Sequence, residues 1–161
     1  MSEEKSLPQK KDHAGVKIPP PLCYFSFLVI GIGLSSDWVN GDFGTLPQIL
    51  VGAVFILAGL LITIPEALNH KKAGSNVEPW KPTTTIIDTG LYAHSRNPIY
   101  VGMTVFYLGI AIMAWSLVAL LLLPLCLLII QSHVIAREEA YLEDKFGNEY
   151  LSYKARVRRW I

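Results

Sequence analysis

Long apolar stretches alternate with polar segments along the 161 residues of the chain. Uncharged stretches cover residues 22–36 and 46–65, and a third, from 97 to 136, contains no Asp, Glu, Lys or Arg. As one helix, the roughly 40 residues of the third stretch would be about 60 Å long, twice the hydrocarbon core of a bilayer. We therefore predict that it folds back near Met113–Ser116, where Trp115 lies beside a small polar residue. The pattern predicts four membrane-spanning helices, at about 22–38, 46–68, 98–114 and 116–136.

The polar ends of the chain have different patterns. Residues 1–21 are polar and end in three prolines, which predicts a flexible cytoplasmic tail. We expect no cleavable signal peptide, because Ser35, Ser36 and Asp37 follow the first apolar stretch in place of a cleavage site. In residues 137–160, apolar side chains recur every three or four positions, which predicts amphipathic cytoplasmic helices that lie on the membrane or cap the bundle. The recurring residues are Leu142, Phe146, Tyr150, Tyr153, Val157 and Trp160.

Composition and charge support a membrane protein and indicate its orientation. The chain is 52% hydrophobic and 17% charged, and its net charge of +1 gives no reason to expect a nucleic acid partner. All 14 Lys and Arg residues lie before the first span, between the second and third, or after the fourth. The loop between the first two spans carries only Asp37 and Asp42. Because cytoplasmic segments retain Lys and Arg, we predict an all-α integral membrane protein, residues 22–161 forming one domain, with both termini in the cytoplasm.

Candidate chemistry lies in two polar segments next to the predicted spans, residues 81–102 and Arg137–Glu139. Asn97 and Pro98 begin the third span, and the free N–H groups of a helix N-terminus favour an anionic ligand. The residues alone leave another interpretation open, in which these side chains only anchor span ends at the membrane surface. No histidine or cysteine spacing indicates a metal site.

Four motifs follow one another in the second half of the chain. They are N-x-x-P-x-x-P-T-T-x-x-x-x-T-G-x-Y at 76–92, R-N-P-x-Y-x-G at 96–102, E-E at 138–139, and F-G-x-E-Y-x-x-Y at 146–153. Their order and spacing resemble those of the membrane methyltransferases related to isoprenylcysteine carboxyl methyltransferase and the phospholipid methyltransferases. The chain is most similar to the prokaryotic branch of this family, which implies a prokaryotic cytoplasmic membrane.

The resemblance implies S-adenosylmethionine as methyl donor, held at the cytoplasmic face. It also implies a lipophilic small molecule or lipid-modified acceptor that arrives from the lipid bilayer. By position, the expected cofactor-binding residues are a strand-like stretch, Thr84, Thr85, Ile86 and Ile87, together with Tyr92, Asn97, Pro98, Ile99, Tyr100 and Glu138. An arginine of the eukaryotic enzymes corresponds to Val134, so Arg137, the nearest arginine, becomes the candidate catalytic residue.

Two other functions remain open at this point. Membrane sterol-type reductases that use NADPH end in a related R-H-P and F-G-x-x-Y arrangement, although they need more spans. A small bundle protein without enzymatic activity would also fit the apolar pattern. The acceptor of a methyltransferase is equally open, since a carboxylate, an amine, a thiol and a phospholipid headgroup all fit the sequence.

Overall fold

The structure is a computed structural model that describes residues 12–35 and 45–161. Within these ranges the chain is helical, as predicted, and no strand is present; an isolated bridge joins Ser95 to Arg158. The predictions for the tail before residue 12, with its basic residues, and for the loop that carries Asp37 and Asp42 lie outside the described residues.

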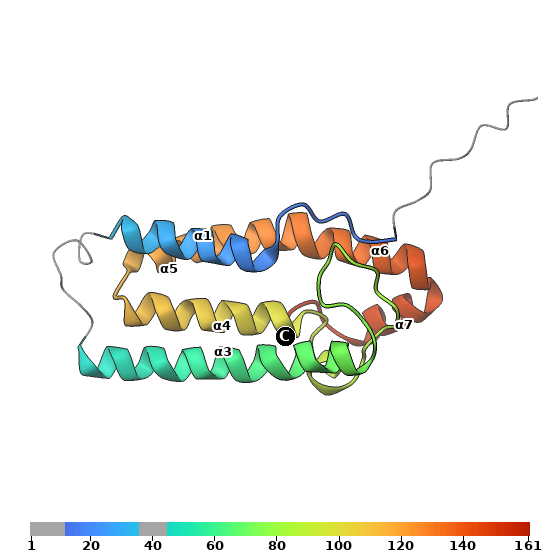
Figure 1. The fold of residues 1–161 in the computed structure, drawn as a ribbon, viewed down its shortest axis with the longest axis horizontal. Helices are drawn as coiled ribbons and strands as arrows, with labels where there is room; N and C mark the ends of the chain where they lie inside the picture. The colour runs from blue at the N-terminus through green and yellow to red at the C-terminus, as the bar shows by residue number, and fades with distance from the viewer. Residues whose placement is uncertain (1–11, 36–44) are drawn as a thin grey trace, which may run out of the picture.

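Long, roughly parallel helices form the body of the molecule, and the loops that carry polar residues gather at one end (Figure 1). Two helices, Leu46–Lys72 and the continuous Leu117–Phe146, are long and apolar enough to cross a membrane. Two further apolar helices, Pro20–Gly33 and Pro98–Met113, are shorter. The elements are α1 Pro20–Gly33, α3 Leu46–Lys72, η1 Gly90–Ala93, α4 Pro98–Met113, α5 Leu117–Ile129, the π-helix η2 Ile130–Ile135, α6 Ala136–Phe146 and α7 Asn148–Arg156.

The turn between α4 and α5 lies at Ala114–Ser116, where the long uncharged stretch was expected to fold back. Trp115 has a φ of +51°, a left-handed conformation that reverses the chain direction. The hydroxyl of Ser116 accepts a hydrogen bond from the Ala119 N–H at 3.0 Å and so caps α5. It also donates to the Gly31 carbonyl of α1 at 3.0 Å, which fixes the turn to a neighbouring helix.

Some features differ from those expected, among them the end of α3, which lies at Lys72 rather than 68. Helix α1 begins at Pro20, because proline is well suited to the first turn of a helix. The fourth long helix does not end at 136 but continues through α6, and the chain turns at Gly147, where φ is +54°. The stretch 84–87, expected to be strand-like, is irregular, since no second strand lies beside it in the described part of the chain.

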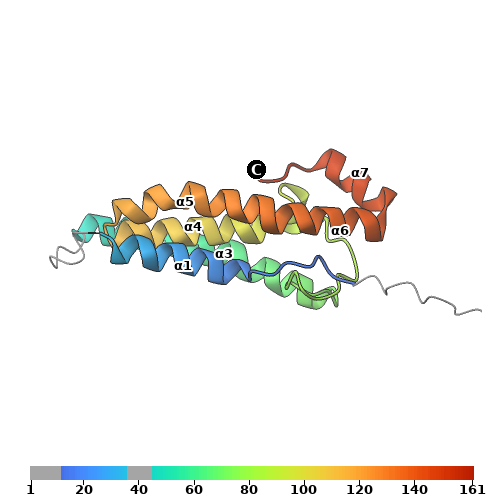
Figure 2. The same ribbon diagram turned by 90° about the horizontal axis from the view of Figure 1, so that it is seen from above.

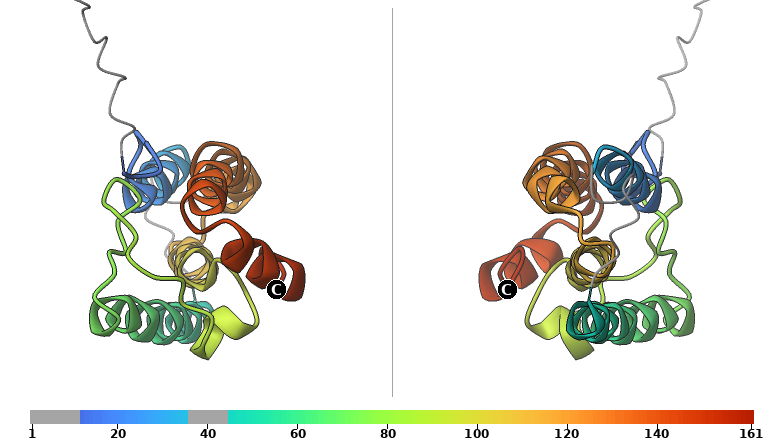
Figure 3. Two further views of the ribbon diagram at one scale, coloured as in Figure 1. Left: turned by 90° about the vertical axis from the view of Figure 1, so that its right-hand side faces the viewer. Right: turned by 90° about the vertical axis from the view of Figure 1, so that its left-hand side faces the viewer.

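Helix α4 lies at the centre, with α1 and α5 on one side and α3 on the other (Figure 3). Helix α3 packs on α4 through glycines. A Cβ atom on Gly59 would lie 2.6 Å from the Phe106 nitrogen, and one on Gly109 would lie 2.6 Å from the Ile56 nitrogen. The two backbones therefore approach each other so closely that only glycine fits, as in small-residue interfaces between membrane helices.

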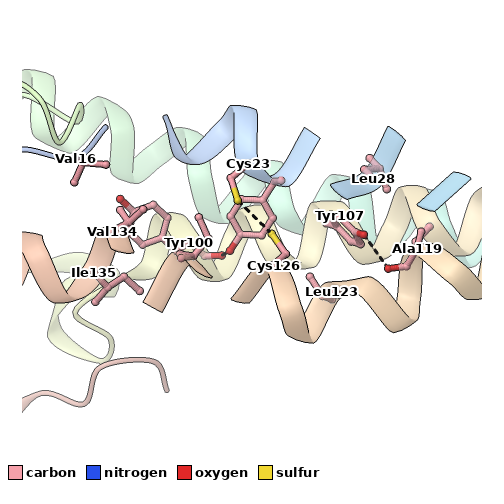
Figure 4. Packing of buried hydrophobic residues seen from close by; sticks show 13 residues of the cluster. Val16, Cys23, Leu28, Tyr100, Tyr107, Ala119, Leu123, Cys126, Val134 and Ile135 are labelled. Carbon is pink, nitrogen blue, oxygen red and sulfur yellow. Dashed lines mark hydrogen bonds between the residues drawn. The ribbon is translucent and has the colours of Figure 1, made fainter. Parts of the chain in front are cut away.

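The remaining core lies between α1, α4 and α5 (Figure 4). Tyr107 is fully buried there, and its hydroxyl donates to the Ala119 carbonyl at 2.8 Å. Cys23 and Cys126 are buried free cysteines whose sulfur atoms are 4.0 Å apart. By contrast, large apolar side chains of α3 are exposed along its length, which suits a surface in contact with lipid.

Candidate functional site

A cavity of about 190 Å³ lies where the start of α1, the start of α4 and helix α6 meet the loop between α3 and α4. A single water needs only about 10–15 Å³ on this measure, so the cavity has room for a small organic molecule. Apolar and polar side chains both line it. Its walls include Pro20 and Pro21 from α1, Ile99, Tyr100 and Met103 from α4, and Glu138 from α6.

Glu138 and Tyr100 form a hydrogen-bonded pair in the wall of this cavity. The Tyr100 hydroxyl donates to the Glu138 carboxylate at 2.8 Å. Glu138 lies beyond the apolar stretch that ends at Ala136. Burial raises its pKa to about 7, although the Tyr100 hydrogen bond acts in the opposite direction; the nearby charge of Glu139 raises it further. In the described part of the chain Glu138 forms no ion pair, so a positively charged ligand in the cavity would be favoured.

Tyr92 lines the cavity from the short helix η1, which is held from two sides. Its hydroxyl is 2.9 Å from the His70 Nε2 atom of α3, and its carbonyl accepts from the Tyr153 hydroxyl of α7 at 2.8 Å. One residue earlier, the Leu91 N–H donates to the buried Glu66 carboxylate of α3 at 3.0 Å. The position of Tyr92 therefore depends on how α3 and α7 are placed.

Glu139 lies beside the cavity and holds the C-terminal segment. It accepts hydrogen bonds from Arg96 at 2.7 Å and from two nitrogens of Arg159 at 2.9 and 2.7 Å. Burial would raise the pKa of Glu139, but the hydrogen bonds from Arg159 and Arg96 outweigh it and the pKa is lowered. The Asn97 amide donates to the Arg159 carbonyl at 2.9 Å. The segment after α7 thus caps the bundle through contacts with α4 and α6.

Comparison with known proteins identifies the family to which the chain belongs. The family model described as phospholipid methyltransferase matches residues 47–149, more than half of the chain. The chain belongs to the phospholipid methyltransferase family. The match covers the part of the chain from α3 to the start of α7, and so includes most of the residues that line the cavity.

Individual relatives agree with this family. Over 152 residues, 94% of the chain, it is 26% identical to an Arabidopsis thaliana protein-S-isoprenylcysteine O-methyltransferase B and covers 74% of that protein. It is 38% identical over 72 residues, 45% of the chain, to the corresponding Schizosaccharomyces pombe enzyme, of which it spans 30%. An uncharacterized Haemophilus influenzae protein is 47% identical over 55 residues, which are 31% of the chain and 87% of that protein. No solved structure gives a significant match.

Most of the residues that the resemblance to this family indicated line the cavity. They are Thr85, Ile86, Ile87, Tyr92, Asn97, Ile99, Tyr100 and Glu138. Two do not. Thr84 is turned into its own loop, where its N–H and hydroxyl donate to Ser75 and Gly74. Pro98 is buried in the first turn of α4.

Arg137 also lies outside the cavity. It is exposed, and its guanidinium donates to the Gly15 carbonyl at 3.0 Å in a separate shallow hollow. Its position gives no support to a catalytic role.

Sequence reasoning missed other lining residues. His70 carried no signal, because its partner Tyr92 is 22 residues away in a loop of irregular shape. Tyr150 and Tyr153 belong to a recognised motif, but their spacing indicated only a packing face. They do pack, in a cluster with Ile86 and Leu142, and they line the cavity as well.

Proposed function

We propose that this protein transfers a methyl group from S-adenosylmethionine to a lipophilic or membrane-embedded acceptor at the cytoplasmic face of its membrane. The observation that carries the proposal is the half-buried carboxylate of Glu138, which lines the cavity, accepts a hydrogen bond from Tyr100 and forms no ion pair within the described residues. Family membership supplies the methyltransferase chemistry, and it favours this activity over a sterol-type reductase or a bundle without activity.

The cavity residues suit a cationic methyl donor. When bound, S-adenosylmethionine supplies an activated methyl group on a positively charged sulfur, and it carries an ammonium group as well. The Glu138 carboxylate, oriented by the Tyr100 hydroxyl, offers a charge-assisted hydrogen bond to such a group. The rings of Tyr92 and Tyr100 border the same space and can attract a cation through their π faces. Methyl transfer depends chiefly on alignment, so residues that hold the donor still contribute directly to the rate.

Other lining residues of the cavity suit an apolar acceptor. Pro20, Pro21, Ile99 and Met103 line the cavity from the ends of α1 and α4, next to the apolar surfaces of these helices. The names of the family and of two relatives refer to phospholipids and to isoprenylcysteine, both lipid-related groups. We therefore propose that the acceptor reaches the cavity from the bilayer and the donor from water.

The helix packing and the basic residues also bear on the orientation of the protein in its membrane. We propose that α1 and α4 cross the bilayer together with α3 and the α5 helix, because they pack side by side with them (Figure 2). In the described part of the chain, the basic residues lie in the segments that flank the cavity end of these helices. This charge distribution favours a cytoplasmic location for that end.

A transfer assay tests the proposal. Membranes that contain the protein are incubated with S-adenosylmethionine carrying a labelled methyl group and with a lipid extract, and label in the lipid fraction is measured. We expect transfer by the wild type and loss of transfer in Glu138→Gln. The matched control is Glu143→Gln on the same helix, whose half-exposed carboxylate pairs with Lys154 away from the cavity. Folded wild-type protein that neither binds nor uses the donor would contradict the proposal.

A further inference from the structure

Two segments cover the cavity on its polar side. We call residues 12–19 the N-terminal strap; Ala14 of the strap lines the cavity. The second segment, residues 74–85, is called the covering loop, and it includes the lining residues Trp80, Thr83 and Thr85. Figure 3 shows the covering loop reaching from α3 across to the strap. Both segments therefore stand between the cavity and water.

One side chain of α6, Tyr141, joins the two segments. Its hydroxyl accepts a hydrogen bond from the Thr83 N–H of the covering loop at 3.1 Å. The same hydroxyl donates to the Asp12 carboxylate of the strap at 2.8 Å. Lys145, one turn further along α6, completes the cluster with a 2.6 Å ion pair to Asp12. Tyr141 itself lines the cavity.

The strap is attached elsewhere by only a few contacts. The Arg137 guanidinium donates to the Gly15 carbonyl at 3.0 Å, and Gly15 has a φ of +64° that turns the strap toward α1. Val16 is 7% exposed and packs in the main core, so it anchors the end of the strap nearest to α1. Ala14 also packs against this core, whereas Asp12 at the far end of the strap is held by polar contacts that are open to solvent, and each such contact contributes little.

We propose that Tyr141 is a positioning residue that fastens the N-terminal strap and the covering loop over the cavity, and that these segments open to exchange the methyl donor. A polar donor must enter from the water side, because α1 and α4 continue from the cavity as apolar helices. Segments held by a few solvent-exposed hydrogen bonds open at a low free-energy cost, as exchange requires. Arg137 then also helps to hold the strap, through its hydrogen bond to the Gly15 carbonyl. The inference rests on the proposed function for the identity of the ligand. The fastening of the strap and the covering loop by Tyr141, which we call the clasp, is a property of the free protein.

Hydrogen exchange of the full chain in nanodiscs, without ligand, tests the clasp directly. Tyr141→Phe removes the hydroxyl and keeps the ring. We expect faster amide exchange in the strap and in the covering loop, most clearly at the Thr83 amide, which loses its acceptor. Asp12→Ala should accelerate exchange in the strap only, because the bond between Tyr141 and Thr83 remains.

A matched control separates the clasp from a general loss of stability. Tyr107→Phe also removes one tyrosine hydroxyl, but that hydroxyl binds the Ala119 carbonyl in the core between the long helices. It should leave exchange in both covering segments at the wild-type rate. Asp88→Asn is the control for Asp12→Ala, since Asp88 is an exposed acid whose ion pair with Arg156 lies away from the cavity.

Ligand measurements give the second readout. With S-adenosylmethionine, Tyr141→Phe should raise the dissociation rate and KM of the donor by about three- to ten-fold, the effect of one or two hydrogen bonds, and leave kcat unchanged. Unchanged exchange in Tyr141→Phe, the same change in Tyr107→Phe, or a lower kcat at constant KM would overturn the inference. If wild-type protein binds no S-adenosylmethionine, the proposed function fails, and the exchange experiment still decides on the clasp.

Discussion

The contact between α3 and α4 allows a prediction that connects helix packing to the cavity. A methyl group on Gly59 would lie 2.6 Å from the Phe106 nitrogen and 2.7 Å from the Gly102 oxygen, whereas ordinary contacts begin at 3.4 Å. Both neighbours are backbone atoms, so no side-chain rotation relieves the overlap, and α3 must move away from α4. Overpacking of this kind costs about 1–3 kcal/mol of stability. In Gly59→Ala we therefore expect the unfolding temperature to fall by several degrees.

The displacement should also reach the cavity. Helix α3 carries Glu66 and His70, which hold η1 and the hydroxyl of Tyr92. We therefore expect Gly59→Ala to weaken donor binding although the residue lies far from the cavity. Thermal unfolding in detergent and titration with S-adenosylmethionine measure the two effects.

Gly33→Ala is the control, because nothing lies within 4 Å of the added methyl group there, and alanine is the better helix former. Equal stability of the two variants would refute the close approach of α3 and α4.

Three further predictions concern charge and capping. Affinity for S-adenosylmethionine should rise as pH increases through about 7, because the free carboxyl of Glu138 is protonated below that pKa and a cationic ligand needs the ionised form; titrations from pH 6 to 8 should show this in wild type and not in Glu138→Gln. Glu139→Gln should lower the free energy of unfolding by about 3 kcal/mol, because Arg96 would stay buried without its counter-charge, and denaturation in detergent measures this loss. Ser116→Ala should cost about 1 kcal/mol in the same assay, since α5 loses its cap.

The sequence was sufficient for the helices of the body but not for the direction of individual side chains. Uncharged stretches and one interfacial Trp predicted where α4 ends and α5 begins. Three consecutive residues of α6 show the limit. Successive residues on a helix differ by about 100°, so Arg137 contacts the strap, Glu138 faces the cavity and Glu139 binds Arg96. Adjacent position in sequence therefore gave no reason to choose Arg137 for catalysis.

The expected end of the fourth long helix, at residue 136, differs from the structure for a related reason. Loss of hydrophobicity after Ala136 indicated the end of the membrane stretch, but Arg, Glu, Ala and Leu are good helix formers and α6 continues until Gly147. The covering loop could not be predicted at all, because its shape depends on contacts between distant residues such as Thr83 and Tyr141. Family motifs marked this region without giving its conformation.

The most direct test of the account is the binding of S-adenosylmethionine to purified protein in nanodiscs, measured by calorimetry for wild type, Glu138→Gln and Glu143→Gln. We expect saturable binding by the wild type and by Glu143→Gln, and at least ten-fold weaker binding by Glu138→Gln, with all three proteins equally monodisperse. Equal affinity of Glu138→Gln and wild type would contradict the assignment of this cavity as the donor site.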